Sequence, residues 1–131
     1  MEGTAEEELE RRSKFLNSLI QKKKKAVEQK QQNDRMNIRV RASDMPLPLQ
    51  NHAFKAARDI LDSMASGKLD SKRLALSLKK DFDSTYGPAW HCIVGTSFGS
   101  YVTHSLGGFL YFSIDKVYVL LFKTAVEPLD Q

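Results

Sequence analysis

The chain has 131 residues, a formal net charge of +4 and a single cysteine, Cys92. This length accommodates one small domain and an appendage, and one cysteine excludes an internal disulfide framework and a cysteine-rich metal site. No apolar run approaches the ~20 residues that span a bilayer, and the N-terminus begins acidic without a signal-peptide core, so we expect a soluble, cytosolic protein.

The charge is concentrated in the N-terminal third. Residues 1–41 contain eleven Lys/Arg against seven Asp/Glu, a net of +4, while residues 42–131 contain nine of each. The high isoelectric point therefore describes an extension, which we place at residues 1–37, and not the domain that follows it.

Within this extension, residues 6–32 pass from Glu-rich to Lys-rich and carry sparse apolar positions at three-, four- and seven-residue spacings, as a weakly amphipathic helix would. These positions are Leu9, Leu16, Leu19, Ile20 and Val27. Barely two apolar heptads can be drawn, too few for a sustained coiled coil. We predict a solvated, fraying helix or a disordered arm, and the sharper alternatives are a partner-binding helix or a lysine patch for nucleic acid or acidic membrane.

The rest of the chain predicts an α+β domain over residues 38–124. Residues 37–42 alternate apolar and polar side chains, as a half-exposed strand would. A first helix is expected over residues 51–66 and a second after the N-cap Asp70, ending at Gly87. Strands are expected over Trp90–Val94, Phe98–Thr103, Phe109–Ile114 and Val117–Lys123, with a local hairpin at residues 95–97, and residues 125–131 form a tail.

No catalytic or metal-binding constellation is present in the sequence. His91 and Cys92 are neighbours in a predicted strand, where adjacent side chains point to opposite faces, so they cannot form a nucleophile and base pair. The three histidines, His52, His91 and His104, lack the short repeated spacing of zinc ligands. We therefore predict no enzymatic activity, no metal, no cofactor and no small-molecule substrate.

The predicted strand Phe98–Thr103 mixes Gly, Ser, Thr and Tyr on both faces, a composition that suits an edge or an interface better than a buried centre. An open edge invites another strand, so this segment is a candidate for recognising extended peptide by strand addition.

The sequence resembles a known family. Trp90–Gly95 and Phe98–His104 carry most of the resemblance, which extends over about residues 42–124 and includes Lys79–Asp83, Tyr86–Pro88, Phe109–Phe112 and Leu120–Lys123. The chain is similar to the eight-kilodalton, hub-type dynein light chains. The resemblance implies two helices packed on an antiparallel β-sheet, with a short first strand near residues 42–47.

The resemblance further implies a strand-exchanged homodimer with two parallel peptide grooves, in which the strand matching Phe98–Thr103 crosses to the partner subunit. Clients with a central Gln, often flanked by Thr, would add to this strand, with the Gln at the start of the second helix and the Thr beside His104. The implied peptide-binding residues are Ser71, Lys72, Ser97, Phe98, Gly99, Ser100, Tyr101, Val102, Thr103, His104, Phe109 and Tyr111. Without the resemblance, His104 would be interpreted as an exposed polar strand residue.

The implied dimer interface contains His91, Lys80, Ser100, Tyr101 and Thr103. We hypothesise that His91 is neutral in the dimer, so that association weakens as the pH falls through the histidine range. A buried histidine bonded within its own subunit is the competing interpretation.

The sequence departs from the family pattern at four positions near the groove. Ser71 replaces an acidic residue, Ser113 a frequent Tyr, Tyr118 a smaller residue and Pro46 a polar one. Pocket volume and motif preference are expected to change, while the pairing of the backbone should survive.

These observations predict a non-catalytic dimeric hub that binds linear motifs in disordered segments of partner proteins and promotes their dimerisation. Such a hub can be a subunit of a dynein motor, with the dynein intermediate chain as a candidate partner, in the cytoplasm and on the cytoskeleton. The alternative is an adaptor whose basic N-terminal helix binds acidic membrane or nucleic acid. Deleting residues 1–37 discriminates them, because only the hub would retain its principal partner.

Overall fold

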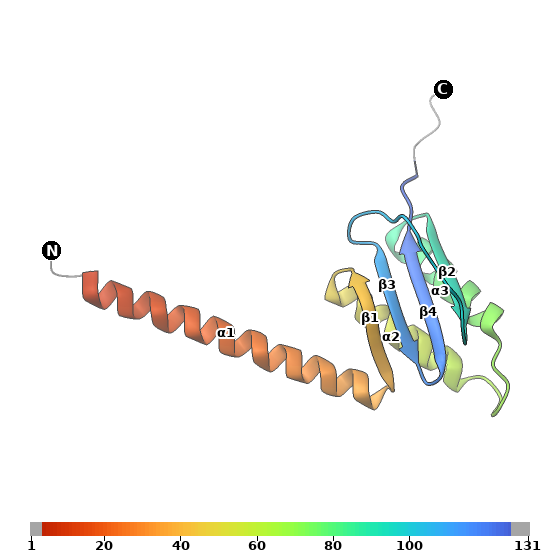
Figure 1. Cartoon of the computed structure of the whole chain (residues 1–131), viewed down its shortest axis with the longest axis horizontal. Coiled ribbons are helices and arrows are strands. Elements are labelled where there is room, and N and C mark those ends of the chain that lie inside the picture. Colours follow the sequence, from red (N-terminus) through yellow and green to blue (C-terminus); the bar gives the residue numbers. More distant parts are fainter. Residues whose placement is uncertain (1–3, 127–131) are drawn as a thin grey trace, which may run out of the picture. The chain divides into compact units, whose positions relative to one another are not determined.

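A computed structural model of the chain describes residues 4–126 (Figure 1). The chain divides between Arg35 and Met36 into two compact units. The first is a single helix, α1 (Thr4–Arg35), which extends the predicted helical segment at both ends and buries none of its side chains. No helix within residues 4–126 combines the length and the apolar character needed to cross a lipid bilayer. Most of the predicted C-terminal tail, residues 127–131, lies outside the described range.

The second unit is the predicted α+β domain. Its elements are β1 (Ile38–Asp44), α2 (Leu47–Asp62), α3 (Ser71–Tyr86), β2 (Trp90–Gly95), β3 (Phe109–Ile114) and β4 (Val117–Lys123). The strands form one antiparallel sheet in the order β1-β3-β4-β2. The sheet therefore has β1 at one edge and β2 at the other.

The first strand differs from the position that the resemblance implied, and α2 begins and ends four residues before the helix that apolar spacing predicted over residues 51–66. β1 occupies Ile38–Asp44, close to the alternating residues 37–42, and the expected position near residues 42–47 is wrong because α2 already begins at Leu47. The reason is Pro48, whose missing N–H and fixed φ are tolerated in the first turn of a helix but not within a strand ladder. The second helix begins as predicted, with the Asp70 carboxylate accepting the Arg73 N–H at 3.0 Å.

The hydrophobic core lies between one face of the sheet and the two helices α2 and α3, which cover the same side (Figure 1). Phe82 of α3 packs edge-on against Trp90 of β2, with ring centroids 4.9 Å apart, and Phe54 of α2 packs against Phe112 of β3 at 5.1 Å. These four side chains are almost completely buried. Each contributes roughly 1.5–3 kcal/mol through removal of apolar surface from water.

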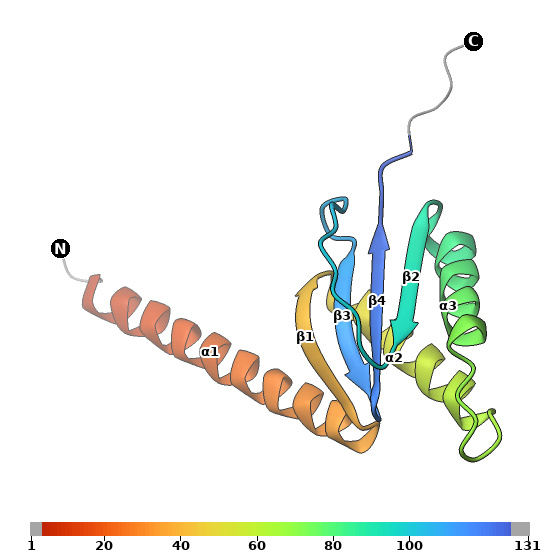
Figure 2. The ribbon, with the colours of Figure 1, turned by 45° about the vertical axis from the view of Figure 1, so that its right-hand side comes forward.

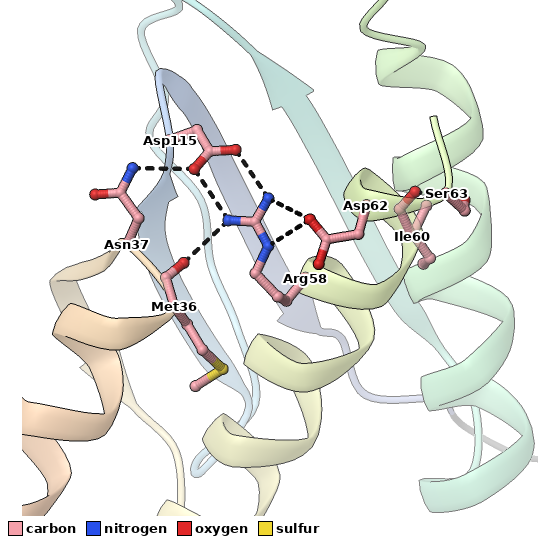
Figure 3. Close-up of polar contacts among 7 residues, drawn as sticks. All are labelled: Met36, Asn37, Arg58, Ile60, Asp62, Ser63 and Asp115. Atoms are coloured by element: carbon pink, nitrogen blue, oxygen red, sulfur yellow. Dashed lines mark hydrogen bonds and ion pairs between the residues drawn. The ribbon is translucent and has the colours of Figure 1, made fainter. Parts of the chain in front are cut away.

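A polar cluster around Arg58 of α2 fixes the beginning of the sheet (Figure 3). The guanidinium donates to the Met36 carbonyl at 3.0 Å and to both carboxylate oxygens of Asp115, in the β3–β4 turn, at 2.9 and 3.0 Å. Asn37 donates to the same carboxylate at 3.0 Å, and Asp62 also pairs with Arg58. The Arg58 guanidinium holds the pKa of Asp115 below its usual range. Two segments distant in sequence are thereby held against one helix.

The predicted strand Phe98–Thr103 is not a strand in the single chain, and the predicted hairpin at residues 95–97 does not form. β2 ends at Gly95 and β3 begins at Phe109. Figure 2 shows the chain between them crossing in front of β4, on the side of the sheet away from α2. We call residues 96–108 the connecting segment. A strand exists only where a second backbone completes its hydrogen bonds, and no such neighbour is present here.

Candidate functional site

The sheet face away from the helices is rich in aromatic side chains. Strand alternation places Leu110, Phe112, Val119 and Leu121 in the helix-facing core and their neighbours on the opposite side. We call this opposite side the open face. Its residues are Phe109, Tyr111 and Ser113 of β3, Tyr118, Leu120 and Phe122 of β4, and His91 and Ile93 of β2.

Aromatic contacts on the open face run across neighbouring strands. The His91 ring stacks on Phe122, its cross-strand partner, at 5.2 Å between centroids, and Tyr111 lies 6.0 Å from Tyr118. Tyr118 is also directly opposite Ser113. The open face therefore gains an aromatic ring from β4 beside the position where the resemblance implies one on β3.

A bulge in β1 aims a cation at this face. The register of β1 against β3 shifts between Val40 and Ala42, which leaves Arg41 as the extra residue. Bulges of this kind redirect a side chain, and the Arg41 guanidinium carbon lies 5.6 Å from the centre of the Tyr118 ring. The sequence did not indicate this contact, because the bulge depends on pairing with β3.

The connecting segment is anchored to the open face at both ends. Near its start, the Phe98 ring lies 6.1 Å from Tyr111, and a Cβ at Gly95 would approach the Phe98 ring to 3.3 Å. Near its end, the His104 ring stacks on Phe109 at 4.7 Å. These contacts bring together four of the residues predicted to bind peptide: Phe98, His104, Phe109 and Tyr111.

Asp44, at the end of β1, completes the second anchor. Its carboxylate accepts the Gly107 N–H at 3.0 Å and lies 3.9 Å from His104 Nδ1. His104 Nδ1 is also 2.9 Å from the carbonyl oxygen of Ser105. The contact that holds His104 spans 60 positions of sequence and was not predicted; the polar end of a strand beside a Gly-Gly turn was the only local signal.

Between the anchors the backbone has no partner. Within residues 4–126, the main-chain groups of Ser97–Thr103 form no hydrogen bond, and the Tyr101 side chain is fully exposed at 102%. The outer edge of β2 is open as well, because β2 pairs with β4 alone in the described sheet. The single chain thus presents two unfinished ladders, a strand edge and a strand-forming segment.

The remaining predicted site residues lie elsewhere on the domain. Ser71 and Lys72 form the first turn of α3, where Asp70 accepts the N–H of Arg73 while the amides of Ser71 and Lys72 have no acceptor within residues 4–126. No hydrogen bond, ion pair or ring contact of the described chain joins Ser71, Lys72 or Lys80 to the connecting segment.

His91 is exposed in the single chain, and its Nε2 lies 3.1 Å from the hydroxyl of Thr124. The competing interpretation of a buried histidine is therefore wrong for the isolated subunit, although the bond within the subunit is present. Its position at a dimer interface stays a prediction.

The structure places Cys92 away from acid–base chemistry. His91 faces the open side, whereas Cys92 packs against the helix-facing core. Burial raises the pKa of the Cys92 thiol to about 12, so the thiol is protonated at neutral pH and is a poor nucleophile. The described residues contain no group of three or more His, Cys, Asp or Glu side chains that could hold a metal ion.

The motif Lys79–Asp83 has a structural role at the start of β2. Asp83 accepts the Trp90 N–H at 2.8 Å, and Lys79 donates to the Trp90 carbonyl at 2.9 Å while pairing with Asp83 at 2.6 Å. Burial raises the pKa of Asp83, but the bonds from Lys79 and Trp90 outweigh it and hold that pKa below its usual range. This clamp positions the edge strand whose outer side is open.

A second polar contact joins the helices behind this edge. His52 of α2 lies 2.8 Å from the Asp81 carboxylate through Nε2 and 3.1 Å from the Tyr86 hydroxyl through Nδ1. Its ring also packs edge-on against Phe82 at 5.2 Å. His52 is thus a link between α2 and α3, which sequence spacing could not reveal.

Comparison with known proteins identifies the family. Residues 37–124 match the profile described as Dynein light chain type 1. The chain is 45% identical over 85 residues to "Dynein light chain 1, cytoplasmic" of Candida glabrata, covering 65% of this chain and 94% of that protein. It is 44% identical over 86 residues to "Dynein light chain" of Schistosoma mansoni, covering 65% and 91%.

A solved structure has the same fold. The dynein light chain-like domain of the Fasciola hepatica calcium binding protein FhCaBP2 superposes with a TM-score of 0.61 at 22% identity, covering 69% of this chain and 94% of that domain. The match of residues 37–124 covers the unit that carries the open face. The chain therefore belongs to the dynein light chain type 1 family.

Proposed function

We propose that this protein is a non-catalytic, homodimeric adaptor of dynein-type assemblies that binds short linear motifs by β-strand addition. In the dimer, residues 98–103 of each subunit pair with the open edge of β2 of the other subunit. The outer side of the same segment then receives a client peptide. Two identical grooves hold two copies of one disordered partner and promote its dimerisation.

One observation carries this proposal: the main chain of Ser97–Thr103 is rich in strand-forming residues, forms no hydrogen bond within residues 4–126, and belongs to the same domain as an open β2 edge. Unpaired ladders of this kind are templates for another chain. The names of the Candida and Schistosoma relatives support an association with dynein, and the former supports a cytoplasmic location.

The open face supports specificity. Phe109 and Tyr111 of β3 lie beside the segment that would pair with the client, and both are half-buried. In strand addition the backbone supplies affinity and alternate side-chain pockets supply selectivity. The amides of Ser71 and Lys72 suit the carbonyl of a client Gln, since the first N–H groups of a helix have no intrahelical acceptor.

A proline scan of residues 99–102 tests the proposal. Successive N–H groups of a strand point to opposite edges, so prolines of one parity remove bonds to the second subunit and prolines of the other parity remove bonds to the client. We expect one parity to abolish both dimer and peptide binding. The other parity should preserve the dimer and weaken a fluorescent peptide with a Gln flanked by Thr at least tenfold.

The readouts are mass by light scattering and affinity by fluorescence anisotropy. Residues 99–102 form no main-chain hydrogen bond within residues 4–126 of the single chain, so every proline variant should retain the circular dichroism spectrum of a folded subunit, and only the variants that lose the dimer should lose strand signal. An unchanged mass and affinity across all four variants would contradict the proposal, and so would loss of the folded spectrum.

A further inference from the structure

The long helix α1 is not part of the matched family domain and has its own chemistry. Apolar side chains recur along one side of it, and Leu9, Leu16, Ile20 and Val27 are each more than half exposed. Thirty-two residues of helix without one buried side chain gain nothing from packing, although packing supplies most helical stability in proteins. We call these four side chains the stripe, and nothing within residues 4–126 buries any of them.

Charge along α1 is arranged in two blocks around the centre of this stripe. Four glutamates lie between Glu6 and Glu10, and four consecutive lysines occupy Lys22–Lys25. Leu16 lies midway between the blocks. Within residues 4–126 neither block forms an ion pair with any other part of the chain.

We propose that α1 pairs antiparallel with α1 of a second copy of this chain. With Leu16 opposite Leu16 of the second copy, each glutamate block faces a lysine block. A parallel pair would place glutamates beside glutamates and lysines beside lysines, which is destabilising. The charge pattern therefore selects both the occupant, a second copy, and its direction.

The flanks of the stripe agree with this direction. At 3.6 residues per turn, Glu10 and Lys24 lie on one flank of the stripe, and Glu8 and Lys23 lie on the other. A twofold axis perpendicular to the helices brings like flanks together, so Glu10 meets Lys24 and Glu8 meets Lys23 of the second copy. Both ion pairs form in nearly the same register as the one that places Leu16 opposite Leu16 of the second copy.

The geometry also decides which copies pair. From Leu16 to the end of α1 at Arg35 is about 29 Å, so the domains at the two ends of an antiparallel pair stand roughly 57 Å apart. A domain of this size has a radius of gyration of about 12 Å, so two domains joined by strand exchange lie much closer together than that. Resting on the dimer of the proposed function, α1 therefore links one dimer to another and multiplies the number of grooves.

Charge reversal in the full chain tests the pairing. In K23E/K24E both lysines that flank the stripe are reversed, and we expect the mass measured by sedimentation at micromolar concentration to fall at least twofold. R11E/K25E makes the same change of charge on the opposite side of the helix and should leave the mass unchanged. Adding E8K/E10K to K23E/K24E restores complementary blocks and should restore the mass.

The mass of the wild type should be at least twice that of K23E/K24E whether the domain by itself is a dimer or a monomer. Failure of the proposed function and failure of this inference are therefore distinguishable. Equal masses for wild type and K23E/K24E would overturn the pairing. Should those lysines instead be required for binding vesicles of phosphatidylserine and phosphatidylcholine, with the mass unaffected, α1 would be a membrane-binding helix and the proposal would be wrong.

Cross-linking tests the direction. In a Cys92→Ala background, a mixture of the Glu10→Cys and Lys24→Cys chains should form a disulfide-linked dimer under mild oxidation. Either chain alone should not. Cross-linking of Glu10→Cys with itself, without cross-linking in the mixture, would establish a parallel pair and overturn the antiparallel arrangement.

Discussion

The two faces of the sheet share the same strands but differ in what completes them. On the helix-facing side, side chains such as Leu110, Phe112 and Leu121 are fully buried by α2 and α3. On the open face, their neighbours Tyr111 and Phe122 remain partly exposed, and residues 97–103 of the segment that crosses this face form no backbone hydrogen bond within the described chain. One face is completed by the chain itself and the other is not.

We therefore expect the residues on one face of the sheet to determine stability and those on the other face to determine recognition. A substitution on the helix-facing side should change the free energy of unfolding, and a substitution between the two anchors of the connecting segment should change association and leave the subunit folded.

Replacing Phe82 by Ala should cost about 3–5 kcal/mol of unfolding free energy, because it removes a fully buried ring that contacts Trp90, Tyr86 and His52 and leaves a cavity. Urea denaturation of the variant and wild type measures this. The control is Leu106→Ala, whose side chain is 96% exposed and belongs to neither the predicted groove nor the predicted dimer interface, and it should change the value by no more than about 0.5 kcal/mol. Similar losses in both variants would remove the distinction between the two regions.

Two glycines of the connecting segment are expected to differ in how their replacement by Ala affects stability. A Cβ at Gly108 would lie 2.8 Å from the Lys123 Cβ and 3.5 Å from its backbone nitrogen, so Gly108→Ala should destabilise the fold by about 1–3 kcal/mol. A Cβ at Gly99 meets nothing within 4 Å, so Gly99→Ala should be neutral or slightly stabilising. Thermal unfolding of both variants decides, and equal melting temperatures would contradict the prediction.

The Arg58 cluster predicts a pH dependence on the helix side. Because Arg58 lowers the pKa of folded Asp115, its ionisation stabilises the fold above the unfolded pKa of about 3.9 and ceases to do so as the pH falls through the lowered value. Asp115 is partly exposed, so the contribution at pH 7 should be about 1 kcal/mol or less.

Unfolding of wild type and Asp115→Asn between pH 7 and pH 2 measures this contribution. The two curves should converge at the acidic end. Asp59→Asn is the control and should follow the wild type throughout. Asp59 is an exposed residue of α2 whose carboxylate forms no ion pair within residues 4–126. Parallel curves for wild type and Asp115→Asn would contradict the expected role of the pair.

Features that depend on local sequence were predictable, and features that depend on distant partners were not. The α3 start was predictable because the Asp70 cap is local, and β3 and β4 were predictable because their strand-forming residues are continuous and their turn is tight. The resemblance implied Phe109 and Tyr111 as site residues, and alternation along β3 places both on the open face. These features depend on neighbours in sequence.

The unpredicted features depend on distant partners. Residues 98–103 have strand propensity, yet propensity supplies no ladder, so the segment is not a strand in the single chain. The Arg58–Asp115 pair joins residues 57 positions apart, and nothing local signals it. The bulge that aims Arg41 likewise exists only in the pairing of β1 with β3.

The smallest expected effect is at Arg41, the cation above the Tyr118 ring on the open face. Exposed cation–π contacts contribute about 0.5–1 kcal/mol, so Arg41→Ala should lower stability by no more than that. A double-mutant cycle with Tyr118→Ala isolates the contact. If the two side chains interact, the loss of stability in the double mutant differs from the sum of the losses in the two single mutants. Arg39→Ala in the same cycle is the control and should show no coupling. If Arg41 and Tyr118 also behave additively, the bulge presents Arg41 to solvent, and on the open face its charge would then be available to a client carboxylate.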